Sequence, residues 1–400
     1  MAMNILPSKY DIIPIHCSDI SAFNRCKRYW DFTSPTRNNL RRRVDLYGVN
    51  VPLWLGTGIH YALEMFYNPM LHRDPVEAWT TWFDYQWFGG LVTEEWLDRT
   101  YDIHPFYDEE KKLYRIRGLQ LLHPNPIEEE FLGYKELGIG IMTFYRDYAE
   151  RNDAFEIVAA ETSFSVPLLH PDNGEAITAV DVREQSPNYG KLLEVHARGK
   201  RDALGVDKET GKHFIMDHKT AAKVDEDYFT KLDMDQQVST YAWATEQEIE
   251  LAVDHVVYNV LRKCFPKPPT PLKNGTPSTD RTKESTTPEL FQKYIQDNDL
   301  VDWFQGNDKA QGYYNYLMSA GDENFIIRKK LYRNKCEIEN TGKRIAMVAL
   351  DMIENPRIYP NPTGEWLCTK CAFRGPCLAK EDGSDWKDMI DNGYEENRDR

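Results

Sequence analysis

Two short segments of the sequence combine acidic and basic side chains in a pattern suited to phosphodiester chemistry. One ends in Asp202, three residues after Gly199, and the other runs from Asp217 to Lys219. Side chains on a strand alternate between faces, so Asp217 and Lys219 project to the same side. Carboxylates are hard ligands for Mg²⁺ or Mn²⁺, and a bound metal activates water and neutralises charge on a phosphate. A lysine beside them would stabilise the transition state or orient the water.

Three other residues strengthen this interpretation, although each also has an ordinary explanation. His60 lies at the start of a predicted helix, where a neutral imidazole can complete a metal site. Gln237 and Tyr241 are four residues apart and share one side of the helix that follows the second segment. The alternatives are a hydrogen-bonded histidine, an amphipathic helix and, for an isolated Asp-x-Lys strand, a surface ion pair.

Three of the seven cysteines fall within ten residues, which indicates a metal or cluster rather than a disulfide framework. They are Cys368, Cys371 and Cys377, and Cys26, far away in the sequence, is the candidate for a fourth ligand. Four such ligands can hold a [4Fe–4S] cluster or a tetrahedral zinc ion. We expect this site to have a structural role.

The elements that must position these residues form a small sheet wrapped by helices. Strands are predicted at about 155–166, 193–206, 213–219 and 255–261, and a helix at about 233–246. Turn residues at 207–211 join the second and third strands into an antiparallel hairpin. The pattern predicts an α/β fold with helices at both ends of the chain.

The order of the motifs resembles that of the PD-(D/E)XK nucleases of the RecB and Cas4 branch. The shared motifs are Gly-x-x-x-His, Gly-x-x-Asp, Asp-x-Lys and Gln-x-x-x-Tyr, which end here at His60, Asp202, Lys219 and Tyr241. The resemblance implies a restriction-endonuclease-like mixed β-sheet flanked by helices. It also implies that His60, Asp202 and Asp217 are metal ligands and that Lys219 is the catalytic lysine.

By the same resemblance, Gln237 and Tyr241 would support the lysine or touch the substrate. Glu161 lies on the preceding strand, where related enzymes often keep an acidic residue, and is either an additional metal ligand or an ordinary strand-edge residue. Asp217 stands where many relatives have Glu, and His218 where they have an apolar residue. The sequence leaves open whether His218 lies at the rim of the site or contacts the substrate.

The cysteines add a second resemblance. One early cysteine followed by Cys-x2-Cys-x5-Cys is similar to Cas4 proteins and to the nuclease half of AddAB-type recombination enzymes. In these proteins a [4Fe–4S] cluster joins the helical N- and C-terminal regions, so the resemblance favours iron–sulfur over zinc.

This resemblance implies a single elaborated nuclease domain over residues 1–400. Its expected parts are an N-terminal helical part with the first cluster cysteine and the His motif (1–73), a helical insertion (74–150), the catalytic core (151–262), a flexible proline-rich loop with an insertion (263–325), C-terminal helices with the cluster loop (326–378), and an acidic tail expected to be a solvated appendage (379–400).

The net charge of −15 argues against a protein that coats DNA through bulk electrostatics, but it leaves room for local basic tracks. The candidate DNA-binding residues in two such tracks are Arg41, Arg42, Arg43, Arg328 and Arg333. A solvated charged face is the alternative for each track. The sequence shows neither a signal-peptide pattern nor an apolar run of roughly 18 residues. We therefore expect a cytoplasmic protein without membrane contact, in the host cytoplasm if it is viral.

The expected function is that of a metal-dependent DNA exonuclease, similar to the Cas4-family exonucleases of phages. It would act on single strands or duplex ends in recombination or replication. Its partners would be DNA, recombination or replication proteins and, in a homo-oligomer, further copies of itself. Two alternatives are a Cas4-like nuclease of CRISPR adaptation and a non-catalytic DNA-binding scaffold with a nuclease fold.

Overall fold

The computed structural model describes most of the chain. The described residues are 11–43, 46, 50–87, 91–92, 105–108, 113–116, 128–183, 186–224, 226–233, 235–354 and 357–397. Within these ranges, every helix is too short or too polar to cross a membrane.

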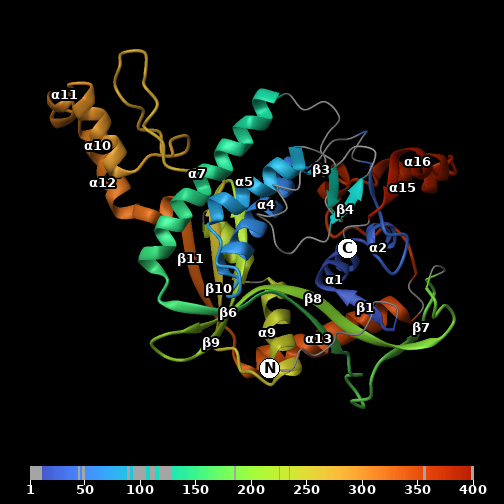
Figure 1. Cartoon of the computed structure of the whole chain (residues 1–400). Coiled ribbons are helices and arrows are strands. Elements are labelled where there is room, and N and C mark those ends of the chain that lie inside the picture. Colours follow the sequence, from blue (N-terminus) through green and yellow to red (C-terminus); the bar gives the residue numbers. More distant parts are fainter. Residues whose placement is uncertain are drawn as a thin grey trace.

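A mixed sheet of seven strands forms the centre of the molecule (Figure 1). Its main order is β1-β8-β9-β10-β11, with β6 and β7 also paired to β8. The strands are β1 (Ile13–His16), β6 (Phe155–Pro167), β7 (Thr178–Val180), β8 (Leu192–Asp207), β9 (His213–Ala221), β10 (His255–Arg262) and β11 (Ile326–Tyr332). The β1–β8 and β9–β10 pairs are parallel, and the others are antiparallel.

The long strand β8 has a gap along one edge. β6 lines the other edge over most of the length of β8. On the gapped edge, β1 pairs with β8 as far as Arg198, and the pairing with β9 starts only at Ala203. The four residues 199–202 therefore have no strand partner on this edge among the described parts of the chain. The first acidic motif of the sequence lies in this opening.

Helices cover both faces of the sheet, because neighbouring residues of each strand face opposite sides. Ile215 of β9 belongs to the hydrophobic core beneath α1, α9 and α13, whereas Met216 belongs to the core beneath α4, α5 and α7. Figure 1 shows these two helix layers on opposite sides of the sheet. Their bounds are α1 (Cys17–Arg25), α9 (Gln236–Ile249), α13 (Lys335–Ile353), α4 (Val51–Tyr67), α5 (Pro75–Trp87) and α7 (Glu128–Asn152).

The central elements agree with the sequence. The four predicted strands are confirmed as β6, β8, β9 and β10, and the hairpin between β8 and β9 is antiparallel as expected. The helix predicted near 233 begins at Gln236 instead, because Asp235 caps it by accepting a hydrogen bond from the Gln237 amide.

The expectation of a solvated tail after residue 379 is wrong. This segment completes α15 (Arg374–Asp382) and forms α16 (Trp386–Gly393) and β12 (Tyr394–Glu396). β12 pairs with β2 (Leu40–Arg42), so the last part of the chain adds a strand to the first part. Phe32, Phe373 and Tyr394 form a small core beneath this pair.

The two regions expected to be insertions differ in structure. Besides α5 and α7, residues 74–150 contain a small sheet of β3 (Leu91–Val92), β4 (Pro105–Asp108) and β5 (Leu113–Ile116), and the rest of this region lies outside the described residues. Residues 263–287 form the expected loop. They lead to α10 (Pro288–Asp297), α11 (Val301–Gln305), α12 (Asp308–Ala320) and η1 (Gly321–Asn324). The helices α10–α12 have their own small core and stand apart from the sheet in Figure 1.

The remaining helices are short: α2 (Lys27–Thr33), α8 (Glu226–Asp233) and α14 (Glu365–Thr369).

Candidate active site

Asp202 lies in the opening between β1 and β9. Its Oδ2 accepts a hydrogen bond of 2.8 Å from the backbone N–H of His218. The regular pairing of β8 with β9 ends at the neighbouring residue, Ala203. The carboxylate thus fills the space where the two strands separate. This contact brings the two acidic motifs of the sequence together.

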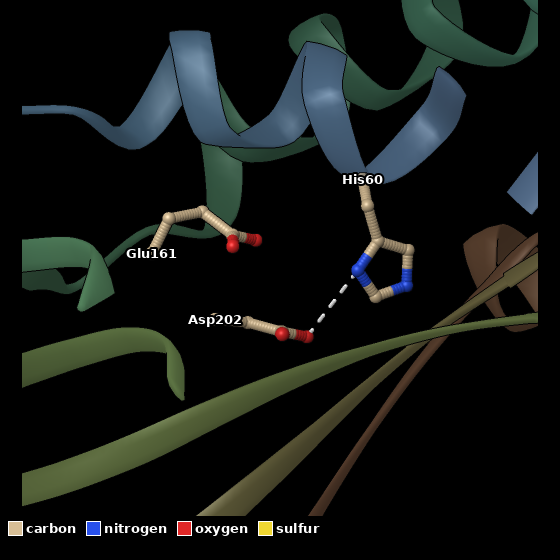
Figure 2. Close-up of side chains that lie close together, drawn as sticks. All are labelled: His60, Glu161 and Asp202. Carbon is tan, nitrogen blue, oxygen red and sulfur yellow. Dashed lines mark ion pairs between the residues drawn. The ribbon is translucent and has the colours of Figure 1, made fainter. Parts of the chain in front are cut away.

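His60 approaches this carboxylate from α4. Its Nδ1 lies 3.5 Å from Asp202 Oδ2 (Figure 2). The helix can come this close because it carries glycine where it meets its neighbours. A Cβ on Gly58 would lie 2.4 Å from the ring of Trp82, and one on Gly56 would lie 3.1 Å from Thr220 Oγ1. Close packing of α4 therefore explains the glycines that precede His60 in this segment.

Glu161 completes a compact group. It lies on β6 between Ala160 and Thr162, which pair with the residues on either side of Asp202. One ligand atom from each of His60, Glu161 and Asp202 falls within 4.8 Å of the other two. Glu161 has a φ of +50°, a left-handed conformation that costs free energy for a residue other than glycine and is concentrated at functional sites.

Asp217 is a buried carboxylate that has an ion pair but no regular hydrogen bond. Its side chain is 1% exposed, and its Oδ2 lies 2.7 Å from Lys219 Nζ. Neither carboxylate oxygen accepts a hydrogen bond of good geometry from the described residues. A buried charge that is compensated only in part is costly, and a bound cation or a proton would lower that cost. Asp217 does not belong to the compact group of three, which contains Glu161 in its place.

The electrostatics of the site favour a divalent cation. Burial raises the pKa of Asp202 to about 7, and the charge of Glu161 adds to this. Burial likewise raises the pKa of Asp217 to about 7, although Lys219 opposes the shift. Burial lowers the pKa of His60, so its imidazole is neutral and able to bind a metal. Closely placed carboxylates with a neutral imidazole are a ligand set that fits Mg²⁺ or Mn²⁺.

Lys219 is held by α9, which covers the face of the sheet opposite α4. Lys219 Nζ donates to Gln237 Oε1 at 2.9 Å, and Gln237 Nε2 donates to Tyr241 OH. Although burial lowers the pKa of Lys219, the neighbouring carboxylates, with Asp217 foremost, together raise it above its ordinary value, and the amine stays charged. In this structure Gln237 and Tyr241 contact the lysine, which is one of the two roles expected from the sequence.

His218 lies in neither of the two places left open by the sequence. Its side chain is buried on the opposite face of β9 from Asp217 and Lys219, stacked on the ring of Tyr67 at 5.7 Å. Asn259 lies within hydrogen-bond distance of its Nδ1. Burial lowers the pKa of His218 well below its ordinary value, so the ring is neutral.

The sequence also missed Lys200. Its ammonium group pairs with the carboxylate of Glu161 beside the metal-ligand candidates. The sequence pattern could have identified it, because Lys200 lies two residues before Asp202 and strand periodicity places both side chains on one face.

The five arginines singled out for DNA binding contact other parts of the protein. The Arg328 side chain is only 13% exposed and pairs with Asp153, so we withdraw it as a DNA contact. Arg333 Nε donates to Ser239 Oγ, and Arg41 pairs with Glu395 at 2.8 Å.

The other two residues of the first track also contact the C-terminal segment. Arg42 Nε donates to the backbone oxygen of Ala372, and the backbone N–H of Arg43 donates to Gly393. A DNA-binding role for Arg41, Arg42, Arg43 and Arg333 stays a prediction without support from these contacts.

The four cysteines singled out in the sequence line one cavity of about 90 Å³. They are Cys26, Cys368, Cys371 and Cys377. Burial, together with the neighbouring thiols, raises the pKa values of Cys371 and Cys377. Thiols gathered in this way are suited to bind a metal or cluster as thiolates.

Hydrogen bonds tie the two ends of the chain together around this cavity. The backbone N–H of Thr363 donates to Arg25, and that of Lys27 donates to Asn361 Oδ1. Arg28, which also lines the cavity, forms an ion pair with Glu381. The structure therefore brings the predicted cysteines together.

Comparisons with known proteins place these observations in context. A search of the curated proteins gives no match. Among solved structures, the one described as "Crystal structure of SSO0001" is 13% identical, with 63% of this chain and 80% of that chain covered and a TM-score of 0.27, and it carries no argument here. The family model of the PD-(D/E)XK nuclease superfamily matches residues 15–378, which include both acidic motifs, His60 and the lysine. The chain belongs to the PD-(D/E)XK nuclease superfamily.

Proposed function

We propose that this protein is a divalent-metal-dependent DNA exonuclease of the RecB and Cas4-like branch, acting at DNA ends in recombination or replication. The observation that carries the proposal is the buried carboxylate of Asp217, which pairs with Lys219 but accepts no regular hydrogen bond, at the place where β8 and β9 separate. Members of the superfamily are in general metal-dependent nucleases, and the motif order supports the finer assignment.

His60, Asp202, Asp217 and Glu161 would hold the metal, which supplies an activated water and charge neutralisation for the scissile phosphate. Lys219 is positioned by Gln237 so that its ammonium group can stabilise the charge that develops on the phosphate oxygens. Asp202 is kept in place by the His218 amide, and Glu161 by Lys200. The protein thus contributes orientation and electrostatics.

We propose that the four cysteines around the cavity hold a [4Fe–4S] cluster rather than zinc. The support for iron–sulfur is the order of the cysteines, one early cysteine followed by Cys-x2-Cys-x5-Cys, which resembles proteins that hold such a cluster. The cavity brings these four residues together. The role of the cluster would be structural, because it would join the first helices to the last ones.

A nuclease assay tests the chemistry. Wild type, Lys219→Ala and the control Lys293→Ala, which changes an exposed lysine of α10, are incubated with Mg²⁺ or Mn²⁺ and end-labelled DNA. We expect wild type and the control to degrade the strand and Lys219→Ala to be inactive. Equal degradation by all three would refute the assignment. Absence of cleavage by wild type would favour a DNA-binding scaffold.

The choice of DNA substrate tests the exonuclease assignment. Linear single strands, duplex ends blocked at 5′ or 3′, and a closed circular single strand are compared. An exonuclease degrades the linear DNA and spares the circle. Rapid cutting of the circle would show endonuclease activity and overturn the proposal. Selective trimming of short overhangs would favour processing in CRISPR adaptation.

Purification without oxygen tests the cluster. We expect iron–sulfur absorption bands in wild type and in Cys336→Ser, whose thiol is exposed and outside the cavity. Cys371→Ser should lose the bands together with solubility and thermal stability. Wild type containing zinc without iron, or a stable and active Cys371→Ser protein that contains no iron, would contradict the proposal.

A further inference from the structure

Three polar residues, two of them buried and the third mostly buried, form a ladder across the sheet on the face opposite Lys219. In the strand registers, His218 of β9 lies beside Asn259 of β10, and Asn259 lies beside Arg328 of β11. Asn259 is fully buried and His218 is 3% exposed. Directly opposed residues on neighbouring strands are close enough for their side chains to interact.

Arg328 determines how the Asn259 amide is oriented. A guanidinium group can only donate hydrogen bonds. Arg328 Nε lies 3.1 Å from Asn259 Oδ1, so this atom must be the oxygen. The amide nitrogen then faces the other way and lies 2.8 Å from both Tyr145 OH and His218 Nδ1. Both hydrogens of the amide are thereby used.

The amide in turn determines the tautomer of His218. Because Asn259 Nδ2 donates, His218 Nδ1 must accept, and the hydrogen of the neutral ring is on Nε2. The ring is also fixed by its near-parallel stacking on Tyr67, with an interplanar angle of 12°.

The same residue reaches the metal site through its backbone. His218 N–H holds Asp202 Oδ2, and His218 stands between Asp217 and Lys219 in the sequence. An anchored side chain at this point restricts the peptide that orients these groups. An apolar side chain, which is usual at this position in related nucleases, would be anchored by packing alone.

We propose that Arg328 and Asn259 are positioning residues for the metal site, which act by holding His218 as the Nε2–H tautomer and so fixing the peptide that binds Asp202. This inference rests on the proposed metal-dependent function. Residues that orient metal ligands from outside the ligand set change metal affinity or activity by about 10–100-fold when they are replaced.

Asn259→Asp gives an isosteric test. A carboxylate still accepts from Arg328, but it cannot donate to His218 Nδ1, so the ring must carry a hydrogen there. We expect the ¹⁵N signal of His218 Nδ1, assigned by its loss in His218→Phe, to change from the unprotonated to the protonated type. Mn²⁺ affinity should fall by about 10–100-fold. Asn298→Asp, at the end of α10, is the matched control and should behave as wild type.

Arg328→Lys is the second variant, because it keeps a positive charge near Asp153 but loses the Nε donor. It should give a mixture of His218 tautomers and a smaller loss of Mn²⁺ affinity. Wild-type ring signals and Mn²⁺ affinity in both variants would overturn the proposal, and if Asn259→Asp does not fold, Arg328→Lys alone decides. Neither readout needs DNA, so absence of cleavage by wild type would refute the nuclease and leave this proposal to its own measurements. A wild type that binds no Mn²⁺ would overturn both.

Discussion

Asp217 and Arg328 are two buried charges on the same sheet, yet their surroundings are opposite. Arg328 has an ion pair with Asp153 and donates hydrogen bonds to Asn259, Tyr67 and Tyr145. Asp217 forms an ion pair with Lys219 but accepts no hydrogen bond of good geometry from the described residues, and the nearby Asp202 repels its charge.

This difference separates a structural charge from a functional one. A charge that supports the fold is compensated by the protein itself, because an unpaired buried charge destabilises the folded state. A charge that awaits a ligand is compensated only in part, and the pKa of such a carboxyl group rises toward 7, as for Asp217. Both arrangements occur within one sheet.

The largest effect should come from removing the charge of Asp217. We expect Asp217→Asn to reduce DNA cleavage by at least about a thousandfold, because it removes a ligand charge from the metal site. In the metal-free protein the variant should also lose the pH dependence of stability that Asp217 contributes, since a neutral amide does not titrate. Activity assays, and urea unfolding in EDTA at several pH values, check both parts, with Asp297→Asn at the end of α10 as the control. An unchanged pH dependence of stability would contradict our interpretation of Asp217.

Removing the charge of Arg328 should mainly lower the free energy of unfolding. Arg328→Met deprives Asp153 of its ion pair and should lower the free energy of unfolding by about 3–5 kcal/mol. The double variant with Asp153→Asn should recover part of this loss, as urea unfolding of the three proteins can show. An unchanged free energy of unfolding in Arg328→Met would remove the contrast between the two regions.

The pH dependence of stability should show the same contrast. The folded-state pKa values of Asp202 and Asp217 are about 7, above the ordinary value of 3.8. Between these values the two carboxyl groups bind more protons in the folded protein than in the unfolded chain, so their contribution to the stability of the metal-free protein should fall as pH rises from about 4 to 7. The lowered pKa values of His60 and His218 act in the opposite direction. Saturating Mn²⁺ should remove the contribution of the carboxyl groups, so the slope of stability against pH should differ between Mn²⁺ and EDTA. Equal slopes would contradict the assignment.

The smallest effect should come from a third kind of charge, one at the surface. Glu395 is 38% exposed and pairs with Arg41. Exposed pairs contribute less than about 1 kcal/mol, so Glu395→Gln should change the midpoint of urea unfolding only slightly. A large loss of stability would mean that the contact between β2 and β12 depends on this pair.

The sequence predicted the parts of the fold and site that depend on local patterns. Alternation along the strands predicted that Asp217 and Lys219 face one side, and the 207–211 turn predicted the hairpin that brings Asp202 near. The left-handed backbone of Glu161 leaves no local signal, because the strand on either side has an ordinary pattern.

Contacts between distant residues were the ones that could not be predicted. The basic cluster around Arg328 was visible, but its partner Asp153 lies 175 positions away in the sequence. Arg41 and Glu395 are separated by 354 positions. The many acidic residues of the tail suggested solvation, whereas its few aromatic residues decide its packing.

The pairing of β2 with β12 constrains how the protein matures during synthesis. A ribosome releases β2 early, but the two strands are far apart in the sequence, with 354 positions between Arg41 and Glu395. The same holds for the cavity that joins Cys26 to the three late cysteines. Domains normally fold as units as they emerge. In this protein α1, α2 and β2 can form their final contacts only after β12 has left the ribosome.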